Sequence, residues 1–311
     1  MKKIILTVTI LMLAGLLFSC QDRQKEKVEA MNSGELEVFC DESYAFILDS
    51  VFTMYRQRYD KVELTVNFVN ARNAKSKLFG GQTRAIIIGR DNLADEDSLM
   101  QLYNIPPYFE MEVANDALVF FTQPDFPLDT LNDVALLKVF TENENLKDIF
   151  PKLNKEPEFV IAHQNSSEYG NFMNLVCKRK SIKKPMLLLP NSDSVIKYVK
   201  NNPNAIGICY LSQIQGQFFK LLRIGYTDEN GDYVKATKVP HQSFIVMGEY
   251  PYITLLRLYL LEEIKNLPYW FGTFVEKESP IVSYYQRMRL VPSYATYKLE
   301  DRRRQRNNRD R

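Results

Sequence analysis

The alternation of strand-like and helix-like segments is the feature that most constrains how this chain can fold. Apolar and polar residues alternate over 36–40 as in a half-buried strand, and apolar residues at helical spacing follow over 47–55. A second alternating stretch at 62–68 and a wholly apolar stretch at 85–88 come next. A strand without polar residues is typical of the interior of a parallel sheet. The first third of the chain therefore predicts an α/β unit with a parallel sheet.

The rest of the chain continues this alternation and predicts a second unit of the same class. With about 290 residues after the N-terminal segment, the chain is long enough for two domains. Further strands are expected at 116–121, 159–162, 186–189, 206–210 and 244–247, and helices at 130–150, from 172, at 192–199, at 253–264 and at 271–288.

The N-terminal segment has the pattern of a secretory signal. Two lysines precede an apolar run at 4–18, which is shorter than the ~20 residues that a membrane-spanning helix needs. The tetrapeptide at 17–20 (LFSC) is similar to a bacterial lipobox. These residues predict a signal peptide at 1–19 and lipidation of Cys20, with an ordinary secreted protein as the alternative.

Charge and composition describe the two ends of the mature chain and the body between them. Residues 21–33 are polar and lack apolar periodicity, so 20–33 is expected to be a lipidated tether. The last ten residues hold six arginines and one aspartate, which leaves a net charge of about −5 on 20–301. A negative body argues against nucleic acid as the main partner, and 297–311 is expected to be a basic, disordered tail.

Neither the cysteines nor the histidines form a pattern that indicates metal binding or catalysis. Cys40, Cys177 and Cys209 lack metal-ligand spacing and are expected to be small buried hydrophobic residues. The only histidines are His163 and His241, and there is no Gly-x-Ser-x-Gly or His-x-x-x-His motif. We expect a non-enzymatic protein without metal or cofactor. A periplasmic hydrolase that uses His163 with neighbouring serines is a minor alternative.

Hydrogen-bond donors follow several of the predicted strands, at positions where helices begin. In open α/β sheets, ligands lie beyond the carboxyl ends of the strands. Helix N-termini there offer unpaired amides and a dipole that favours an anion. A serine at such a position can also be a simple helix cap, and an arginine can pair with a neighbouring aspartate on the surface. The candidate ligand-binding residues are Ser43, Tyr44, Asn70, Ala71, Arg90, Asn165, Ser166 and Ser167.

Five segments, in order, resemble the phosphate-type substrate-binding lipoproteins of ABC transporters, in a divergent branch found in Bacteroidetes-like bacteria. They are 34–44 (GELEVFCDESY), 84–90 (RAIIIGR), 165–167 (NSS), 203–207 (PNAIG) and 290–292 (LVP).

The resemblance implies a type II periplasmic-binding fold, in which two α/β lobes are joined by two crossover strands. Lobe 1 would comprise 34–115 and 243–296, and lobe 2 would comprise 116–242. The crossover strands are expected near 117–121 and 244–247.

The resemblance also implies a function in transport. An inorganic oxyanion, with phosphate favoured, would be captured between the lobes by the candidate residues and presented to a membrane transporter or another energised envelope complex. The lipid would hold the protein in the cell envelope, facing the periplasm. An envelope interaction protein that keeps the fold without tight anion binding is the main alternative.

Overall fold

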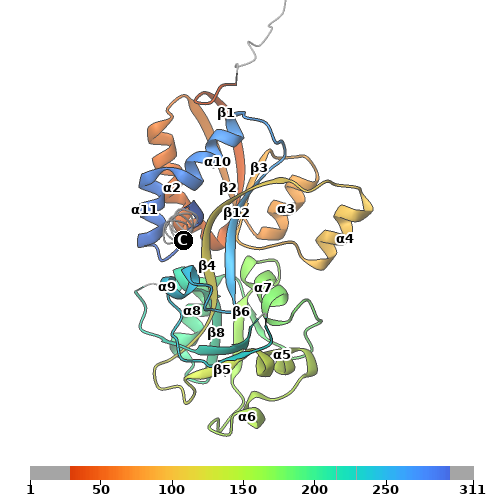
Figure 1. The fold of residues 1–311 in the computed structure, drawn as a ribbon, viewed down its shortest axis with the longest axis vertical. Coiled ribbons are helices and arrows are strands. Elements are labelled where there is room, and N and C mark those ends of the chain that lie inside the picture. Colours follow the sequence, from red (N-terminus) through yellow and green to blue (C-terminus); the bar gives the residue numbers. More distant parts are fainter. Residues whose placement is uncertain (1–28, 215, 229, 295–311) are drawn as a thin grey trace, which may run out of the picture.

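Two lobes joined by two long strands make up the described residues 29–214, 216–228 and 230–294 of the computed structural model (Figure 1). β4 (Phe109–Thr122) and β12 (Ile253–Leu260) are antiparallel partners at the centre of the molecule. Past this pairing, β4 continues into lobe 2 and pairs with β8 (Ala205–Tyr210). Both lobes therefore share one sheet, with the strands in the order β2 (Val62–Val69), β1 (Gly34–Asp41), β3 (Ala85–Ile88), β12, β4, β8, β6 (Glu158–Ala162) and β7 (Leu187–Leu189).

Lobe 1 is a parallel β1–β3 sheet covered by helices on both faces. In the all-apolar β3, Ala85 and Ile87 belong to one hydrophobic cluster and Ile86 and Ile88 to the other, which explains the lack of polar residues. α2, α10 and α11 lie on one side of the sheet in Figure 1, and α3 and α4 on the other. The elements are β1 (Gly34–Asp41), the 3₁₀ turn η1 (Glu42–Tyr44), α2 (Ala45–Arg58), β2 (Val62–Val69), α3 (Ala71–Phe79), β3 (Ala85–Ile88), α4 (Ala94–Leu102), α10 (Leu267–Lys277), α11 (Ser279–Arg287) and β13 (Val291–Pro292).

Lobe 2 repeats the arrangement with a second set of parallel strands. β6 pairs in parallel with both β7 and β8, and a small three-stranded sheet of β11, β10 and β5 adds to this lobe. The elements are β5 (Thr130–Asn132), α5 (Asp133–Glu142), α6 (Leu146–Ile149), β6 (Glu158–Ala162), α7 (Ser167–Asn171), the π-helical turn η2 (Phe172–Val176), β7 (Leu187–Leu189), α8 (Ser192–Asn201), η3 (Leu211–Ile214), β9 (Lys220–Leu221), β10 (Arg223–Thr227), β11 (Tyr233–Val234) and α9 (Gln242–Val246). The expected two-lobed α/β fold is thus confirmed.

Two predicted elements in the C-terminal third are wrong. The helix expected at 253–264 is instead the strand β12, and the crossover strand expected at 244–247 falls in α9. β12 lies between β3 and β4. Leu256, Leu258 and Leu260 belong to one hydrophobic cluster, and Tyr259, on the opposite face, belongs to the other. Its apolar residues therefore satisfy a strand, although their spacing also fits a helix.

Two helices predicted as continuous are divided. The segment 130–150 forms β5, α5 and α6, and α5 ends at Asn143, which has a φ of 63°. The segment 271–288 is split at Glu278, which ends α10 and precedes the proline-containing first turn of α11. The lobe boundaries by residue number stay a prediction.

The described chain begins at the end of lobe 1 remote from lobe 2. There Glu29 accepts hydrogen bonds from Arg84 Nη1 at 2.5 Å and from the Leu267 amide at 3.0 Å. Arg84 directly precedes β3, so this contact lies at the amino ends of the parallel strands. The predicted signal peptide, Cys20 and the basic tail lie outside the described residues.

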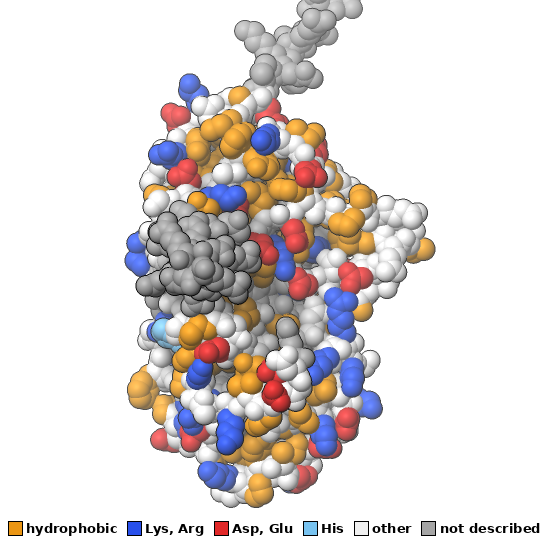
Figure 2. All heavy atoms as spheres, viewed as in Figure 1, with side chains coloured by type: hydrophobic (Ala, Val, Ile, Leu, Met, Phe, Trp, Pro, Cys, Tyr) orange, Lys and Arg blue, Asp and Glu red, His pale blue; other side chains and the backbone are white. Residues whose placement is uncertain are grey.

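Side-chain chemistry on the described surface is mixed, and the three described cysteines are buried. Lys, Arg, Asp and Glu side chains are interspersed over the face seen in Figure 2. Cys40, Cys177 and Cys209 are buried and free, as expected from their apolar surroundings. Burial raises the pKa of the Cys177 thiol to about 12, so it is protonated at neutral pH.

Candidate functional site

The carboxyl ends of β1 and β3 in lobe 1 meet the start of α7 in lobe 2. β1 ends at Asp41, β3 is followed by Gly89, and α7 begins after its cap residue Ser166. Parallel strands end at the same edge of a sheet, so the turns that follow them converge between the lobes. This convergence is the candidate site.

Asp41 links three segments at this point. Its Oδ1 accepts from the Ser43 amide at 3.1 Å, and its Oδ2 accepts from the Gly89 amide at 3.1 Å and from the Ser167 hydroxyl. The side chain is fully buried. Burial, together with the nearby Glu168, raises the pKa of Asp41 to about 6, although the hydrogen bonds favour the ionised form.

A second buried carboxylate, that of Glu168, collects side-chain donors from both lobes. Its Oε2 accepts from the Ser43 hydroxyl of lobe 1 at 2.7 Å. Its Oε1 accepts from the Ser192 hydroxyl at 2.6 Å and from Gln213 Nε2 at 2.7 Å, both in lobe 2. Glu168 is only 1% exposed. Asp41 and Glu168, here called the interlobe carboxylates, therefore accept bonds that join the two lobes directly.

A cavity of about 420 Å³ lies beside Glu168, between the start of α2 and the start of α8. At its edge, His163 Nε2 of lobe 2 lies 2.9 Å from Glu42 Oε1 of lobe 1. Among the described residues that line the cavity, none is a lysine or arginine. The lining residues are Glu42, Ser43, Ala45, Phe46, Ala162, His163, Ser166, Glu168, Pro190, Asn191, Ser192, Asp193 and Gln213.

Of the predicted site residues, Ser43, Ser166 and Ser167 lie around this cavity and the interlobe carboxylates. Ser43 and Ser167 donate to carboxylates, whereas Ser166 caps α7 by accepting from the Tyr169 amide at 3.2 Å. Tyr44 is buried below the site, where its ring stacks on Tyr210 with a centroid distance of 4.9 Å. Its hydroxyl does not reach the cavity lining.

Arg90, predicted to supply the positive charge, is neutralised within lobe 1. Its Nη1 and Nη2 lie 2.7 Å and 2.6 Å from the two carboxylate oxygens of Glu96, and its side chain is 1% exposed. The alternative, a surface ion pair between Arg90 and the Asp91 carboxylate, is also wrong, because that carboxylate pairs with Arg257. The bidentate geometry holds the guanidinium firmly, so its charge is balanced without a ligand.

Of the other predicted residues, Asn165 lies at a second cavity, of about 510 Å³. Asn165 lines it, and its carbonyl accepts from the Arg72 amide of lobe 1 at 3.5 Å. Asn70 caps α3 by accepting from the Asn73 amide at 2.9 Å, and Ala71 is buried in the first turn of that helix. The predicted residues therefore do not surround one ligand position: Ser43 and Ser166 line the first cavity, Asn165 lines the second, and the others line neither.

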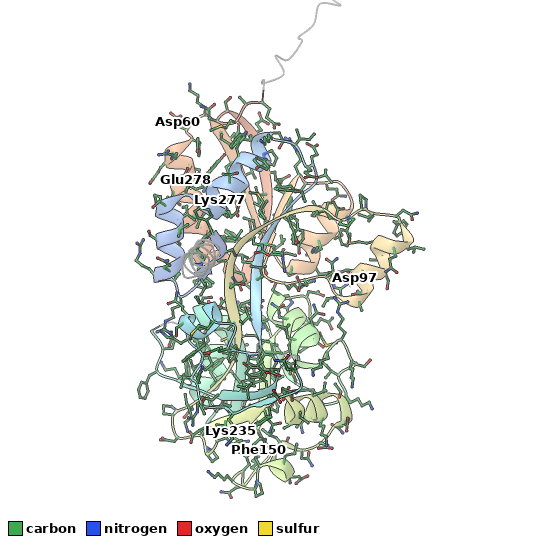
Figure 3. All side chains as sticks on the ribbon, in the orientation of Figure 1. Asp60, Asp97, Phe150, Lys235, Lys277 and Glu278 are labelled. Carbon is green, nitrogen blue, oxygen red and sulfur yellow. The ribbon has the colours of Figure 1, made fainter. Side chains whose placement is uncertain are left out.

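The second cavity contains two arginines, each paired with an aspartate of α4. Arg72 Nη1 lies 2.6 Å from Asp95, and Arg179 Nη1 of lobe 2 lies 2.8 Å from Asp97. α4 projects from lobe 1, and Asp97 is labelled on it in Figure 3. The Arg179–Asp97 pair is therefore another direct bond between the lobes, at a half-exposed position where such pairs contribute little stability.

Backbone carbonyls of lobe 1 receive further bonds from lobe 2. Asn171 Nδ2 donates to the Gly89 carbonyl at 2.7 Å, and Gln213 Nε2 donates to the Ser43 carbonyl at 3.0 Å. Asn174 Nδ2 donates to the Asn92 carbonyl at 3.2 Å. Side-chain amides of lobe 2 therefore add three further hydrogen bonds between the lobes.

A family model described as a PBP superfamily domain matches residues 26–276, most of the chain. The chain belongs to the PBP superfamily. No curated protein sequence shows a significant match to it. In the described part of this PBP-superfamily chain, no helix is both long and apolar enough to cross a bilayer, and no group of three His, Cys, Asp or Glu residues is placed to hold a metal ion.

Solved structures with the same fold include two described as phosphate-transport proteins, and a third described as PstS. An ABC-type phosphate transport receptor from Vibrio cholerae superposes with a TM-score of 0.66 at 14% identity, covering 83% of this chain and 100% of that one. A protein from Clostridium perfringens with bound phosphate, described as a phosphate ABC-transporter substrate-binding protein, gives 0.65 at 14% identity, covering 83% and 99%. PstS from Borrelia burgdorferi gives 0.57 at 15% identity, covering 84% and 99%. At these identities the likeness shows the fold.

Sequence reasoning found the serines of this PBP-superfamily site but missed both interlobe carboxylates. A signal for each was present, because Asp41 directly precedes the first donor turn and Glu168 directly follows Ser166 and Ser167. Their role was hidden because the partners Ser192 and Gln213 lie more than 20 residues away in the sequence from Glu168.

Proposed function

We propose that this protein is an extracytoplasmic solute-binding lipoprotein that captures a small solute between its lobes for transport. The observation that carries the proposal is the cavity beside Glu168, which groups from both lobes line. A solute that contacts both lobes favours the population in which they are together, and this is how hinge closure is coupled to binding. Lipidation of Cys20 would keep the protein at a membrane next to its transporter.

Phosphate is the first ligand to test. The sequence resemblance and the described ligands of the structural neighbours support it. The hydroxyl and amide donors of Ser43, Ser192 and Gln213 are the kind that hold small oxyanions. To use these three donors, phosphate must replace the Glu168 carboxylate. Arg90, whose charge Glu96 balances, is not needed in this pose.

A second candidate is an envelope interaction protein, and one specific observation favours it. The interlobe carboxylates already satisfy donors of both lobes, so the closed arrangement rests on groups of the chain itself. Such a molecule would present a fixed surface to a partner without depending on a solute.

Isothermal titration calorimetry of the mature chain from Gln21 separates these two candidates. We expect saturable phosphate binding at micromolar affinity or tighter, with sulfate, arsenate and molybdate titrated in parallel. Ser192→Ala removes one cavity donor and should weaken phosphate binding by about 3- to 10-fold, in line with ~1 kcal/mol for one hydrogen bond. Ser194→Ala is the control, because the Ser194 hydroxyl lies in the same helix but donates to Asn191. Silence with every anion would contradict the phosphate proposal and support the interaction protein.

A further inference from the structure

We infer that the Glu168 carboxylate is a built-in anion that occupies the interlobe donors and thereby determines which solutes the cleft accepts. The inference concerns the same cleft as the proposed function and rests on it for the identity of the site. A free oxyanion binds at these donors only when the carboxylate leaves them. Glu168 is thus a specificity-determining residue that competes with phosphate.

The donor arrangement around Glu168 is that of an oxyanion site. Three side-chain donors from three separate elements, η1, α8 and η3, converge on its two oxygens at 2.6 to 2.7 Å. Both lobes contribute, as they do when a binding protein closes over a ligand. Because carboxylate and phosphate both present anionic oxygens that accept hydrogen bonds from neutral donors, one can take the place of the other.

Among the described residues, Glu168 also has no basic counter-charge. In the part of the chain that the structure describes, no lysine, arginine or histidine forms an ion pair with it, although it is 1% exposed. A buried carboxylate without a cation is held by hydrogen bonds alone, because these offset its loss of hydration. Neutral donors that hold a buried negative charge are the feature that a site for a small anion requires.

The second interlobe carboxylate strengthens the exclusion of free anions. Asp41 accepts hydrogen bonds from the Ser43 amide and the Ser167 hydroxyl. Ser43 also donates its hydroxyl to Glu168, and Ser167 directly precedes Glu168 in the chain. Burial is the main cause of the raised pKa of Asp41, and the repulsion between the two carboxylates raises it further. A phosphate added beside both groups would meet like charges in a buried setting, where they repel strongly.

The test compares phosphate binding by the wild type, Glu168→Ala, Glu168→Gln and Asp193→Asn. We expect Glu168→Ala to bind phosphate at least ~10-fold more tightly than the wild type, which corresponds to about 1.4 kcal/mol. Glu168→Gln keeps the shape but removes the charge, so it should lie between these two. Asp193→Asn removes a carboxylate that lines the same cavity and is exposed, and it should change the affinity by less than ~2-fold.

A second measurement uses formate, a free carboxylate, as the probe. Formate should raise the midpoint of thermal unfolding of Glu168→Ala, because it refills the emptied donors, but should leave that of the wild type unchanged. Where the alanine variant folds poorly, Glu168→Gln serves the phosphate measurement alone, since its side chain still fills the space that formate would enter. Equal phosphate affinity in all four proteins, or equal formate stabilisation of the wild type and Glu168→Ala, would overturn the inference.

The outcomes also separate this inference from the proposed function. If the wild type binds no anion and Glu168→Ala binds phosphate, the inference stands and phosphate capture by the natural protein fails. If the wild type binds phosphate tightly and Glu168→Ala binds it equally well, the proposed function stands and the inference fails.

Discussion

Asp116 is a buried carboxylate at the point where β4 passes from one lobe to the other. Its Oδ2 accepts from the Ser212 hydroxyl at 2.5 Å, and its Oδ1 accepts from the Ser212 amide at 3.3 Å and the Ala117 amide at 2.7 Å. Burial raises the pKa of Asp116 to about 7, because the hydrogen bonds do not fully replace its hydration.

The raised pKa predicts how stability depends on pH. In the unfolded chain an aspartate loses its proton near pH 3.9, whereas Asp116 in the folded protein keeps its proton to about pH 7. The folded state therefore binds more protons between pH 4 and 7, and the free energy of unfolding falls as pH rises through this window. Asp116→Asn should abolish this fall in the free energy of unfolding. The fall amounts to roughly 1.4 kcal/mol for each unit by which the pKa of Asp116 differs between the folded and unfolded states.

Urea unfolding at pH 5 and pH 8 measures the effect. The difference in the free energy of unfolding between the two pH values should be smaller by a few kcal/mol in Asp116→Asn than in the wild type. Asp41 contributes with the same sign in both proteins, since its pKa is also raised, to about 6. Asp49→Asn, at an exposed position of α2, is the control. An unchanged pH dependence in Asp116→Asn would contradict the assignment.

At the residue scale, sequence patterns predicted the donors of the site but not what they bind. Ser43, Ser166 and Ser167 follow strands, and that local signal places them at helix starts. The acceptors depend on how closely the lobes approach, which is a tertiary property. The guanidinium of Arg90 was predicted to face the ligand. It instead forms an ion pair with Glu96, which lies six residues later in α4.

Among the elements, α7 is the one most closely fitted to its neighbour. A Cβ atom on Gly170 would lie 2.3 Å from Arg90 Cδ, closer than atoms pack. The Arg90 side chain cannot easily move aside, because both its Nη atoms are bonded to Glu96. Glycine at this position therefore allows lobe 2 to contact lobe 1.

Gly170→Ala should destabilise the protein in spite of the helix propensity of alanine. In a helix, replacing glycine by alanine usually stabilises by up to ~1 kcal/mol, but overpacking here should cost about 1–3 kcal/mol and win. Chemical denaturation measures the change. Ser76→Ala, at an exposed position of α3, reports the propensity gain alone. A Gly170→Ala protein as stable as the wild type would show that the interface is loose at this point.

The elements predicted correctly are those with an unambiguous period. β1, β2 and β3 alternate or are wholly apolar, and α8 has its apolar residues on one face. The helix predicted for the segment that forms β12 was wrong because its buried and partly buried residues fit both the helical and the strand period. Only the place of β12 between β3 and β4 decides between the two. Local spacing cannot report that a segment lies at the centre of a sheet.

For the whole molecule, the sequence resemblance predicted the two-lobed architecture that the family match and the structure bear out. Membrane attachment is the property of the whole molecule that stays a prediction. Cys20→Ala should shift the protein from the membrane fraction to the soluble fraction of the producing cells, because the lipid-bearing residue is lost. Immunoblots of washed membranes measure the shift, with Cys40→Ala as the control at a buried position. Retention of Cys20→Ala on washed membranes would contradict lipidation.

The hydrogen bonds from Arg84 and Leu267 hold Glu29, and with it the start of the described chain, at the end of lobe 1 remote from lobe 2. If Cys20 carries a lipid, the nine residues that follow it, up to Glu29, can span no more than ~30 Å between the bilayer and that end of lobe 1. The amino ends of the parallel strands would then face the membrane, and the cleft at their carboxyl ends would face away from it. Lobe 2 would be the part of the molecule farthest from the membrane. A transporter in the same bilayer would therefore reach the cleft only after the protein rotates relative to the membrane.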